Sequence, residues 1–192
     1  MDVVSLLSEH EVRQRLGSHG RSARPSPPYM LFPQNLVERA AKYLQVNGAQ
    51  RLEQLVLWSG YATSEGVVIA GLLLPTTEAT WGWVHVLPSE QPQIVTWLHR
   101  HGQLLFAESH THGSGPRATD MSDEDRRHPA GRQDGFLTMI VPDYALHGID
   151  FRRVGVWECR NLMWNKWHQR DVRTRIRVVE EEEARVALDI HQ

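Results

Sequence analysis

The stretch RLEQLVLWSGYATSEGVVIAGLLLP, residues 51–75, holds two consecutive segments with the pattern of buried β-strands. In the first, residues 51–60, side chains alternate between two faces, and Glu53 lies near the start on the same face as Leu55. The second, residues 66–75, is a continuous apolar run of strand length, far short of the ~20 residues that cross a bilayer. Two such segments in succession predict a buried β-sheet at the centre of the fold.

Helical and extended patterns alternate on either side of this pair. Amphipathic spacing predicts one helix over residues 33–48 and a second over 89–103, with Ser89 as its N-cap. Strand patterns occur at 82–88, 103–109, 135–145, 154–160 and 171–179. This order predicts an α/β fold in which a mixed β-sheet is flanked by helices.

The two ends of the chain differ in composition from its middle. Residues 1–30 begin with apolar positions at mixed helical spacings and continue into a stretch rich in Gly, Ser, Pro and Arg, which predicts a docking helix and a flexible linker. Residues 180–192 open with four consecutive glutamates and predict an acidic, solvated tail. Residues 31–179 form the main domain in this division.

Composition excludes several classes of function. The chain has 192 residues and a formal net charge of −2, which gives no global attraction to nucleic acid or to an anionic membrane. The single cysteine, Cys159, has no internal disulfide partner, and no signal-peptide pattern opens the sequence. We therefore expect a cytoplasmic protein that binds neither nucleic acid nor membrane.

A cluster of histidines and acids follows the predicted strand at 103–109. His110 and His112 are two positions apart, so they point to the same side if the strand continues through Thr111. The sequence SDED at 122–125 comes shortly afterwards. Two imidazoles and one carboxylate are a typical protein ligand set for catalytic zinc, which keeps a fourth position for water. A polar loop, with Ser122 simply capping a helix, is the simpler alternative.

These motifs together resemble the JAMM (JAB/MPN) family of zinc isopeptidases. The resemblance rests on an upstream glutamate, Glu53, seven positions before Gly60, on the His-x-His pair, and on Ser-x-x-Asp at Ser122 and Asp125. It covers roughly residues 31–160, including the strand pattern GFLTMIVPDYA of 135–145. The resemblance implies one catalytic domain with the JAB/MPN fold, which is similar to that of cytidine deaminases.

The sequence departs from the family pattern at two points. Gly113 stands where the family usually has proline, which removes a rigid turn and leaves the ligand residues unchanged. Nine residues separate His112 from Ser122, more than is usual in the family. An ungapped comparison would make Asp123 the ligand and place Asp120 at the serine position. We prefer Ser122 and Asp125, because a surface loop absorbs extra residues at small entropic cost.

The resemblance implies roles for each of these residues. His110, His112 and Asp125 would hold Zn²⁺, Glu53 would be the general base, and Ser122 would stabilise the oxyanion. The implied reaction is cleavage after the C-terminal glycine of a ubiquitin-like protein, for deconjugation or precursor processing, in a bacterial ubiquitin-like conjugation system. The ubiquitin-like protein or its conjugates, and other components of that machinery, are the expected partners.

Other functions stay open at this stage. A related JAMM protease could process a sulfur-carrier protein, and a non-catalytic MPN domain could act as an interaction module. A zinc deaminase would require a pair of cysteine ligands, and the chain has one cysteine. Residues 75–90 and 126–135 flank the predicted site and are candidates for shaping a substrate groove, with Trp81 and Trp83 as possible anchors.

Overall fold

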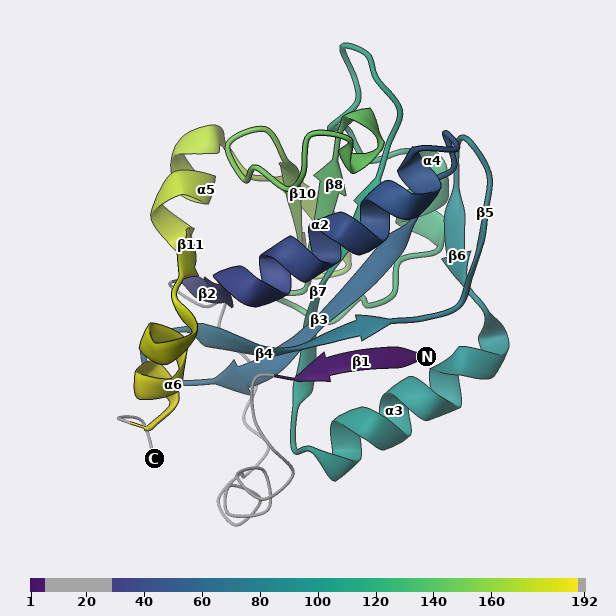
Figure 1. Ribbon diagram of the computed structural model, residues 1–192. Helices are drawn as coiled ribbons and strands as arrows, with labels where there is room; N and C mark the ends of the chain where they lie inside the picture. The colour runs from purple at the N-terminus through teal and green to yellow at the C-terminus, as the bar shows by residue number, and fades with distance from the viewer. Residues whose placement is uncertain (6–28, 190–192) are drawn as a thin grey trace.

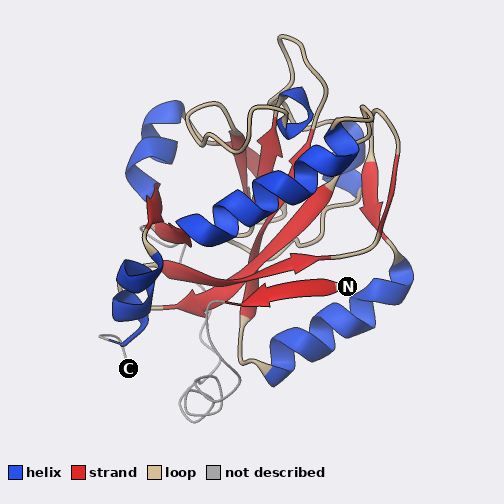
Figure 2. Ribbon diagram, in the orientation of Figure 1, coloured by secondary structure: helices blue, strands red, loops and turns tan. Residues whose placement is uncertain are grey.

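A mixed β-sheet forms the centre of the computed structural model, which describes residues 1–5 and 29–189 (Figure 1). Within these residues the sheet has nine strands, in the order β10-β9-β8-β7-β3-β4-β2-β11, with β1 paired to β4. The central pairs β3–β4 and β3–β7 are antiparallel, whereas β7–β8 is parallel. Helices lie against the sheet (Figure 2), which confirms the predicted α/β class.

The strands of the main sheet and of the separate β5–β6 hairpin have the following bounds: β1 Asp2–Ser5, β2 Met30–Pro33, β3 Leu55–Ala62, β4 Val67–Leu74, β5 Thr77–Ala79, β6 Val84–Val86, β7 Leu104–Thr111, β8 Leu137–Val141, β9 Gly155–Arg160, β10 Met163–Lys166 and β11 Ile176–Val179. The α-helices are α2 Gln34–Gly48, α3 Gln91–Arg100, α4 Asp123–Arg127, α5 Gln169–Arg175 and α6 Glu181–Asp189. Two short 3-10 turns, η1 Pro88–Glu90 and η2 Asp143–Ala145, precede α3 and follow β8.

Alternation along β3 assigns the two faces of the sheet to different cores. Val56 and Trp58 belong to the large core that includes the buried residues of α2. Leu55 and Leu57 belong to a separate core with Ile94 of α3 and residues of β6. Since every second strand residue points to the same face, α2 and α3 cover opposite faces of the sheet. Leu55 pairs with His110, so the candidate site lies on the face that α3 covers.

Gly60 lies in the interior of β3, at the irregular part of its pairing. The β3–β4 register shifts between Ser59 and Gly60. A Cβ at position 60 would collide with the carbonyl oxygen of Val68 on β4. Only glycine allows the two backbones to approach this closely. The strand therefore continues past Gly60 to Ala62, and the expectation that this glycine ends the strand is wrong.

Three predicted elements differ from the structure. Residues 171–179 were expected to form one strand, but α5 ends at Arg175 and only Ile176–Val179 is extended. Val172 is a buried residue of helix α5. The alternation of apolar and basic residues before residue 176 therefore does not mark the two faces of a strand. The strand at 82–88 pairs only with β5, outside the main sheet. Ser89 lies in η1, and the N-cap of α3 is Glu90.

Both ends of the described chain belong to the sheet domain. Residues 2–5 form β1, antiparallel to β4, where the sequence predicted the start of a helix, because β4 offers these residues an open strand edge. The remainder of that prediction lies outside the described residues. Residues 181–189 form α6, which buries Ala184 and Leu188 against the sheet. The prediction of a solvated tail is therefore wrong for this segment.

Within the described part of the chain, no helix combines the length and apolar character that spanning a membrane requires.

Candidate metal centre

The strand β7 carries the histidine pair to one end of the sheet. His110 is in β7, and its pairing with Leu55 of β3 fixes its register. The backbone N–H of His112 donates to the carbonyl of Val141, and the carbonyl of His112 accepts from Tyr144 N–H at 2.7 Å. The chain is thus held in place on both sides of the pair, and His110 is 2% exposed.

Helix α4 presents Asp125 to these histidines. Ser122 is its N-cap and forms a capping box with Asp125: Ser122 Oγ accepts from Asp125 N–H at 3.1 Å, and Asp125 Oδ2 accepts from Ser122 N–H at 2.6 Å. The capping interpretation and the site interpretation of this motif therefore hold together. Asp123 is exposed and is not part of the group formed by His110, His112 and Asp125.

The three side chains place their donor atoms in a compact triangle. His110 Nε2 lies 3.2 Å from His112 Nε2, and Asp125 oxygens lie 3.5 Å from His110 Nε2 and 3.3 Å from His112 Nε2. In a tetrahedral zinc site with bonds of about 2.0–2.1 Å, neighbouring donors are about 3.3–3.4 Å apart. The triangle therefore has the size of one face of such a site. The residues fit Zn²⁺, and their assignment as ligands stays a prediction.

Opposite charges are concentrated at the triangle. Burial disfavours the ionised carboxylate, but hydrogen bonds and charge from both histidines outweigh burial and hold the pKa of Asp125 well below its usual range. Burial also disfavours the imidazolium of His110, yet Asp125, Glu108 and Glu53 raise its pKa to about 9. Burial lowers the pKa of His112. A carboxylate kept ionised beside imidazole nitrogens is a donor set that favours a cation.

Glu53 lies immediately before β3 and faces this group. The β3–β7 pairing continues beyond the strands, since Thr111 N–H donates to the Gln54 carbonyl and Gln54 N–H to Thr111 Oγ1. This register puts Glu53 opposite His112, on the same face. Glu53 is 3% exposed, and its Oε2 makes no hydrogen bond within the described residues. Burial raises its pKa to about 8, and the charges of His110 and Asp125 act on it in opposite directions.

Glu108 is a further buried acid that the sequence analysis missed. Its Oε1 accepts from Thr138 Oγ1 at 2.8 Å and lies 3.8 Å from His110 Nδ1. Its Oε2 accepts from Ala130 N–H at 2.8 Å. A carboxylate behind a ligand histidine favours the imidazole orientation that aims Nε2 at the metal position. The signal in the sequence was its position two residues before His110, on the same strand face.

Gly113 packs closely against Tyr144. A Cβ at position 113 would lie 3.0 Å from Tyr144 Oη, which is tighter than an ordinary contact. That hydroxyl donates to the carbonyl of Trp81, so Tyr144 links the end of β8 to the β5–β6 hairpin. Glycine at position 113 thus accommodates the neighbouring Tyr144 side chain next to the histidine pair.

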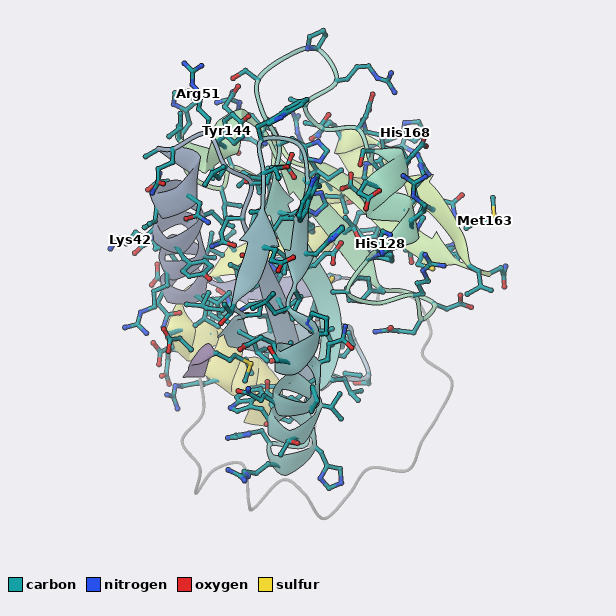
Figure 3. The ribbon with its side chains drawn as sticks, turned by 90° about the vertical axis from the view of Figure 1, so that its right-hand side faces the viewer. Lys42, Arg51, His128, Tyr144, Met163 and His168 are labelled. Atoms are coloured by element: carbon teal, nitrogen blue, oxygen red, sulfur yellow. The ribbon has the colours of Figure 1, made fainter. Side chains whose placement is uncertain are left out.

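The two segments expected to shape a substrate groove both contribute to the wall of one cavity. A cavity of about 550 Å³ lies between residues of the β5–β6 hairpin region, among them His85, and residues 127–132 after α4. Leu55 also contributes to the wall of this cavity, and it lies on the face of β3 that carries the candidate site. Trp81 is 77% exposed and Trp83 is half-buried, with its ring tilted against that of His85, so neither is a core residue. His128, which is exposed and labelled in Figure 3, lies in this wall rather than in the triangle.

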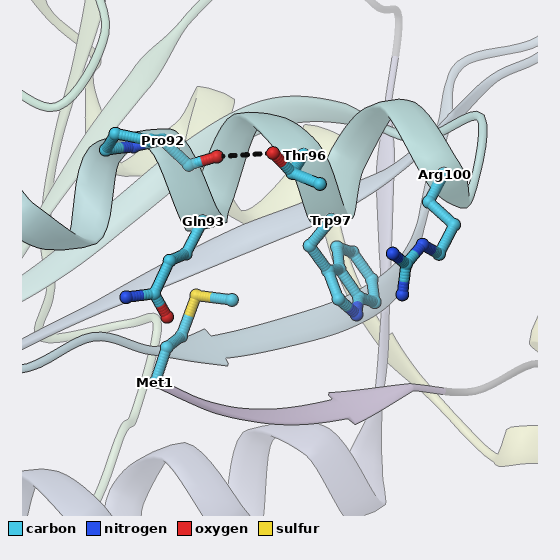
Figure 4. Close-up of a pocket in the computed structure, with 6 residues that line it drawn as sticks. All are labelled: Met1, Pro92, Gln93, Thr96, Trp97 and Arg100. Atoms are coloured by element: carbon cyan, nitrogen blue, oxygen red, sulfur yellow. Dashed lines mark hydrogen bonds between the residues drawn. The ribbon is translucent and has the colours of Figure 1, made fainter.

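A second cavity, of about 320 Å³, lies between α3 and Met1 (Figure 4). It is lined by Met1, Pro92, Gln93, Thr96, Trp97 and Arg100. Thr96 Oγ1 is occupied, since it donates to the Pro92 carbonyl at 2.7 Å. Arg100 is the one charged side chain among these lining residues. This cavity offers no group for acid, base or metal chemistry comparable to the triangle.

Comparisons with known proteins agree with this geometry at a coarse level. No protein-family model matches the chain. The probable metalloprotease y4jG of Sinorhizobium fredii (strain NBRC 101917 / NGR234) is 26% identical over 140 residues, covering 70% of this chain and 85% of that protein. The solution structure of protein DSY2949 from Desulfitobacterium hafniense superposes with a TM-score of 0.57 at 13% identity, covering 79% of this chain and 93% of that one. The first likeness is to a probable metalloprotease, and the second is a likeness of fold alone.

Proposed function

We propose that the protein is a zinc-dependent metalloprotease of the JAMM type. The observation that carries this proposal is the triangle of His110, His112 and Asp125 donors, with edges of 3.2–3.5 Å, beside the buried carboxyl group of Glu53. Similarity to a probable metalloprotease supports the same class of reaction. Fold and site together favour hydrolysis of an amide bond over a purely structural role for the metal.

The metal ligands and Glu53 have different roles in the proposed reaction. When bound, Zn²⁺ supplies a Lewis acid that activates water and polarises the scissile carbonyl. Glu53 takes the proton from the attacking water at its Oε2 and passes it to the leaving nitrogen. A carboxylate destabilised by burial is a stronger base than an exposed one, and a cation at the histidines brings its pKa down toward neutral. Burial and the nearby metal position thus tune one residue for both proton transfers.

In this proposal, Ser122 stabilises the negative charge that develops on the carbonyl oxygen. Its Oγ accepts a hydrogen bond from Asp125 N–H, which leaves the hydroxyl proton to donate elsewhere. The same capping box fixes Asp125, so the donor and the ligand move as one unit on α4. Preorganised donors of this type are worth about 3–4 kcal/mol of transition-state stabilisation in other hydrolases.

The proposed substrate is the C-terminal tail of a ubiquitin-like protein, cleaved after its last glycine in precursor processing or deconjugation. The support is the groove between the β5–β6 hairpin and residues 127–132. β5 and β6 pair only with each other within the described chain, and residues 53–54 contact β5 and Thr80 directly after it, so β6 has the outer edge that an extended peptide would join. Components of a conjugation system would be the partners.

Processing of a sulfur-carrier protein is the second candidate, because its extended glycine-ended tail would use the same groove and chemistry. An interaction module without catalysis is less well supported, since the triangle and Glu53 are all retained. A deaminase is not supported, because zinc deaminases use cysteine ligands and the one cysteine, Cys159, is buried in β9 away from this group.

The test is cleavage of ubiquitin-like proteins extended past the terminal glycine, with the reaction followed by mass spectrometry. Glu53→Gln is expected to keep its zinc and lose about 10²–10⁴-fold in rate. Ser122→Ala should lose both rate and some helix stability, whereas Ser122→Gly costs the N-cap only a few tenths of a kcal/mol and removes the hydroxyl donor without adding charge. Unchanged rates in Glu53→Gln would contradict the proposed mechanism, and zinc binding without cleavage of any such substrate would contradict the substrate class.

A further inference from the structure

A second group of potential metal ligands lies in the groove wall, apart from the first triangle. It consists of His85 on β6, Glu124 on α4 and His128 just after α4. One ligand atom from each residue lies within 4.8 Å of the other two. None of the three belongs to the group formed by His110, His112 and Asp125, although Glu124 is adjacent to Asp125 in the chain.

Its distances fit ligands arranged around a shared ion. Glu124 Oε1 is 3.2 Å from His85 Nε2 and 3.5 Å from His128 Nε2. Both values are near the ~3.3–3.4 Å expected between neighbouring donors of tetrahedral zinc. His85 Nε2 is shielded from solvent, yet its contact with Glu124 is not aligned as a hydrogen bond. A buried imidazole nitrogen without such a partner is costly unless another group meets it.

The surroundings hold Glu124 and His85 in this arrangement. Glu124 Oε2 accepts from the Arg127 guanidinium at 2.8 Å, so Oε1 is left facing the two histidines. The Trp83 ring lies against the His85 ring at a tilt of 31°, with 4.8 Å between ring centroids. The rings of His85 and His128 are 4.9 Å apart. His128 is the most exposed member, at 56%, so its side chain has room to turn toward an ion.

We propose that His85, Glu124 and His128 form a second site for Zn²⁺ or a similar transition-metal ion. Two imidazoles and a carboxylate suit such ions, with water at the remaining position. The ion would join the β5–β6 hairpin to α4, the helix that carries Asp125 and follows Ser122. The second site is therefore a clamp on the groove wall, and it does not depend on the proposed peptidase activity.

Partial exposure gives the second site a lower affinity than the first. His85 and Glu124 are about one third exposed, and His128 more so, whereas His110 and Asp125 are under one tenth exposed. Water competes more strongly for an ion at open ligands, and less of the ligand set is preorganised. Stepwise dialysis against increasing chelator should thus remove the clamp ion before the ion in the first triangle.

The experiment is zinc titration of the metal-free protein by calorimetry, with elemental analysis after equilibrium dialysis. The wild type should bind two ions per chain. His128→Gln and Glu124→Gln should each lose the weaker ion or weaken it by more than about 10-fold, since even outer-shell changes cost about 10–100-fold. His147→Ala, another exposed histidine, is the control and should bind two. His112→Ala should lose only the tighter ion.

Thermal unfolding separates a clamp from loosely bound surface zinc. Excess Zn²⁺ that fills the second site should raise the melting temperature of the wild type and of His112→Ala. This rise should be absent from His128→Gln. One ion per chain in the wild type, or two ions in both His128→Gln and Glu124→Gln, would overturn the proposal. Either result can occur with full peptidase activity, so failure of the clamp is distinguishable from failure of the proposed function.

Discussion

Glu53 combines deep burial with a carboxylate oxygen, Oε2, that makes no hydrogen bond within the described residues. Desolvation of this kind disfavours the ionised form and destabilises the folded state when the carboxyl group loses its proton. The fold tolerates this cost next to His110 and Asp125, whose charges act on Glu53. A cation bound at the triangle would offset part of the cost, so metal binding and ionisation of Glu53 support each other.

The raised pKa of Glu53 predicts a pH-dependent stability in the metal-free protein. The folded pKa is about 8 against an ordinary 4.5, so between these values the unfolded chain releases the proton and the folded chain keeps it. Protonated Glu53 therefore contributes fully to the stability of the folded protein below pH 4.5. This contribution is lost as the pH rises to 8. With EDTA present, Glu53→Gln should match the wild type at pH 4 and exceed it by on the order of 4–5 kcal/mol at pH 8, taking ~1.4 kcal/mol per pKa unit.

Urea unfolding at a series of pH values measures this difference. Glu78→Gln, which removes a carboxylate from the exposed surface of β5, is the matched control. A constant difference between Glu53→Gln and the wild type across the whole pH range would contradict the account of Glu53.

Single residues of the site could be found from the sequence where a spacing rule applied. Histidines two positions apart on a strand must share a face, which predicted the pairing of His110 with His112. The choice between Asp123 and Asp125 stayed open because the length of an irregular loop has no periodicity. The structure brings Asp125 to the histidines through its capping box. Glu108 went unnoticed because a polar residue on a buried strand shows its partners only in three dimensions.

At the scale of elements, close backbone approach at β3 is a structural requirement. Gly60 sits at the bulge where a side chain would strike the backbone of β4. β3 also pairs with β7, the strand that carries His110. A disturbance at Gly60 is therefore transmitted to the strand that positions the site.

Gly60→Ala should destabilise the protein by about 3 kcal/mol, because the added methyl group must displace the Val68 carbonyl. Gly82→Ala is the control, since a Cβ at that position would meet nothing within 4 Å. Equilibrium denaturation measures both. Equal stabilities of the two variants would show that β3 and β4 can separate without cost, against the packing described above.

Long periodic elements were predictable, and short ones were not. The amphipathic repeat that predicted a helix over 33–48 corresponds to α2, which buries Leu36, Ala40 and Leu44. The segment 171–179 alternates in sequence but forms a helical turn before its short strand. Four strand residues give too little pattern to fix a boundary, and pairing with β2 decides where β11 begins.

At the scale of the whole molecule, segments far apart in the sequence complete one sheet. β11 pairs in parallel with β2, and α6 packs its buried residues against Leu31, Tyr61 and Val68. The division into a domain and an acidic tail came from the run of glutamates, which marks an exposed start of α6. The run of glutamates indicated only the exposed face of α6. It gave no sign of the apolar face that packs against the sheet.

Leu188→Ala tests whether α6 is part of the folded unit. Leu188 is 3% exposed in a core cluster, and its truncation should cost about 2–4 kcal/mol. Val186→Ala, on the same helix at 46% exposure, should cost less than about 0.5 kcal/mol. A cooperative shift of the entire unfolding transition in Leu188→Ala is the expected result, and two equally stable variants would contradict the packing of α6.

The most direct measurement is the zinc content of Asp125→Ala and Asp123→Ala, both made in the His128→Gln background so that only the first triangle binds tightly. Asp125 lies 3.3 Å from His112 Nε2, whereas Asp123 is outside the group. The account predicts about one zinc per chain in the His128→Gln parent and in its Asp123→Ala derivative, and loss of that zinc in the Asp125→Ala derivative. Zinc retained by Asp125→Ala, or a parent that binds none after reconstitution, would contradict the assignment of this triangle as the metal centre.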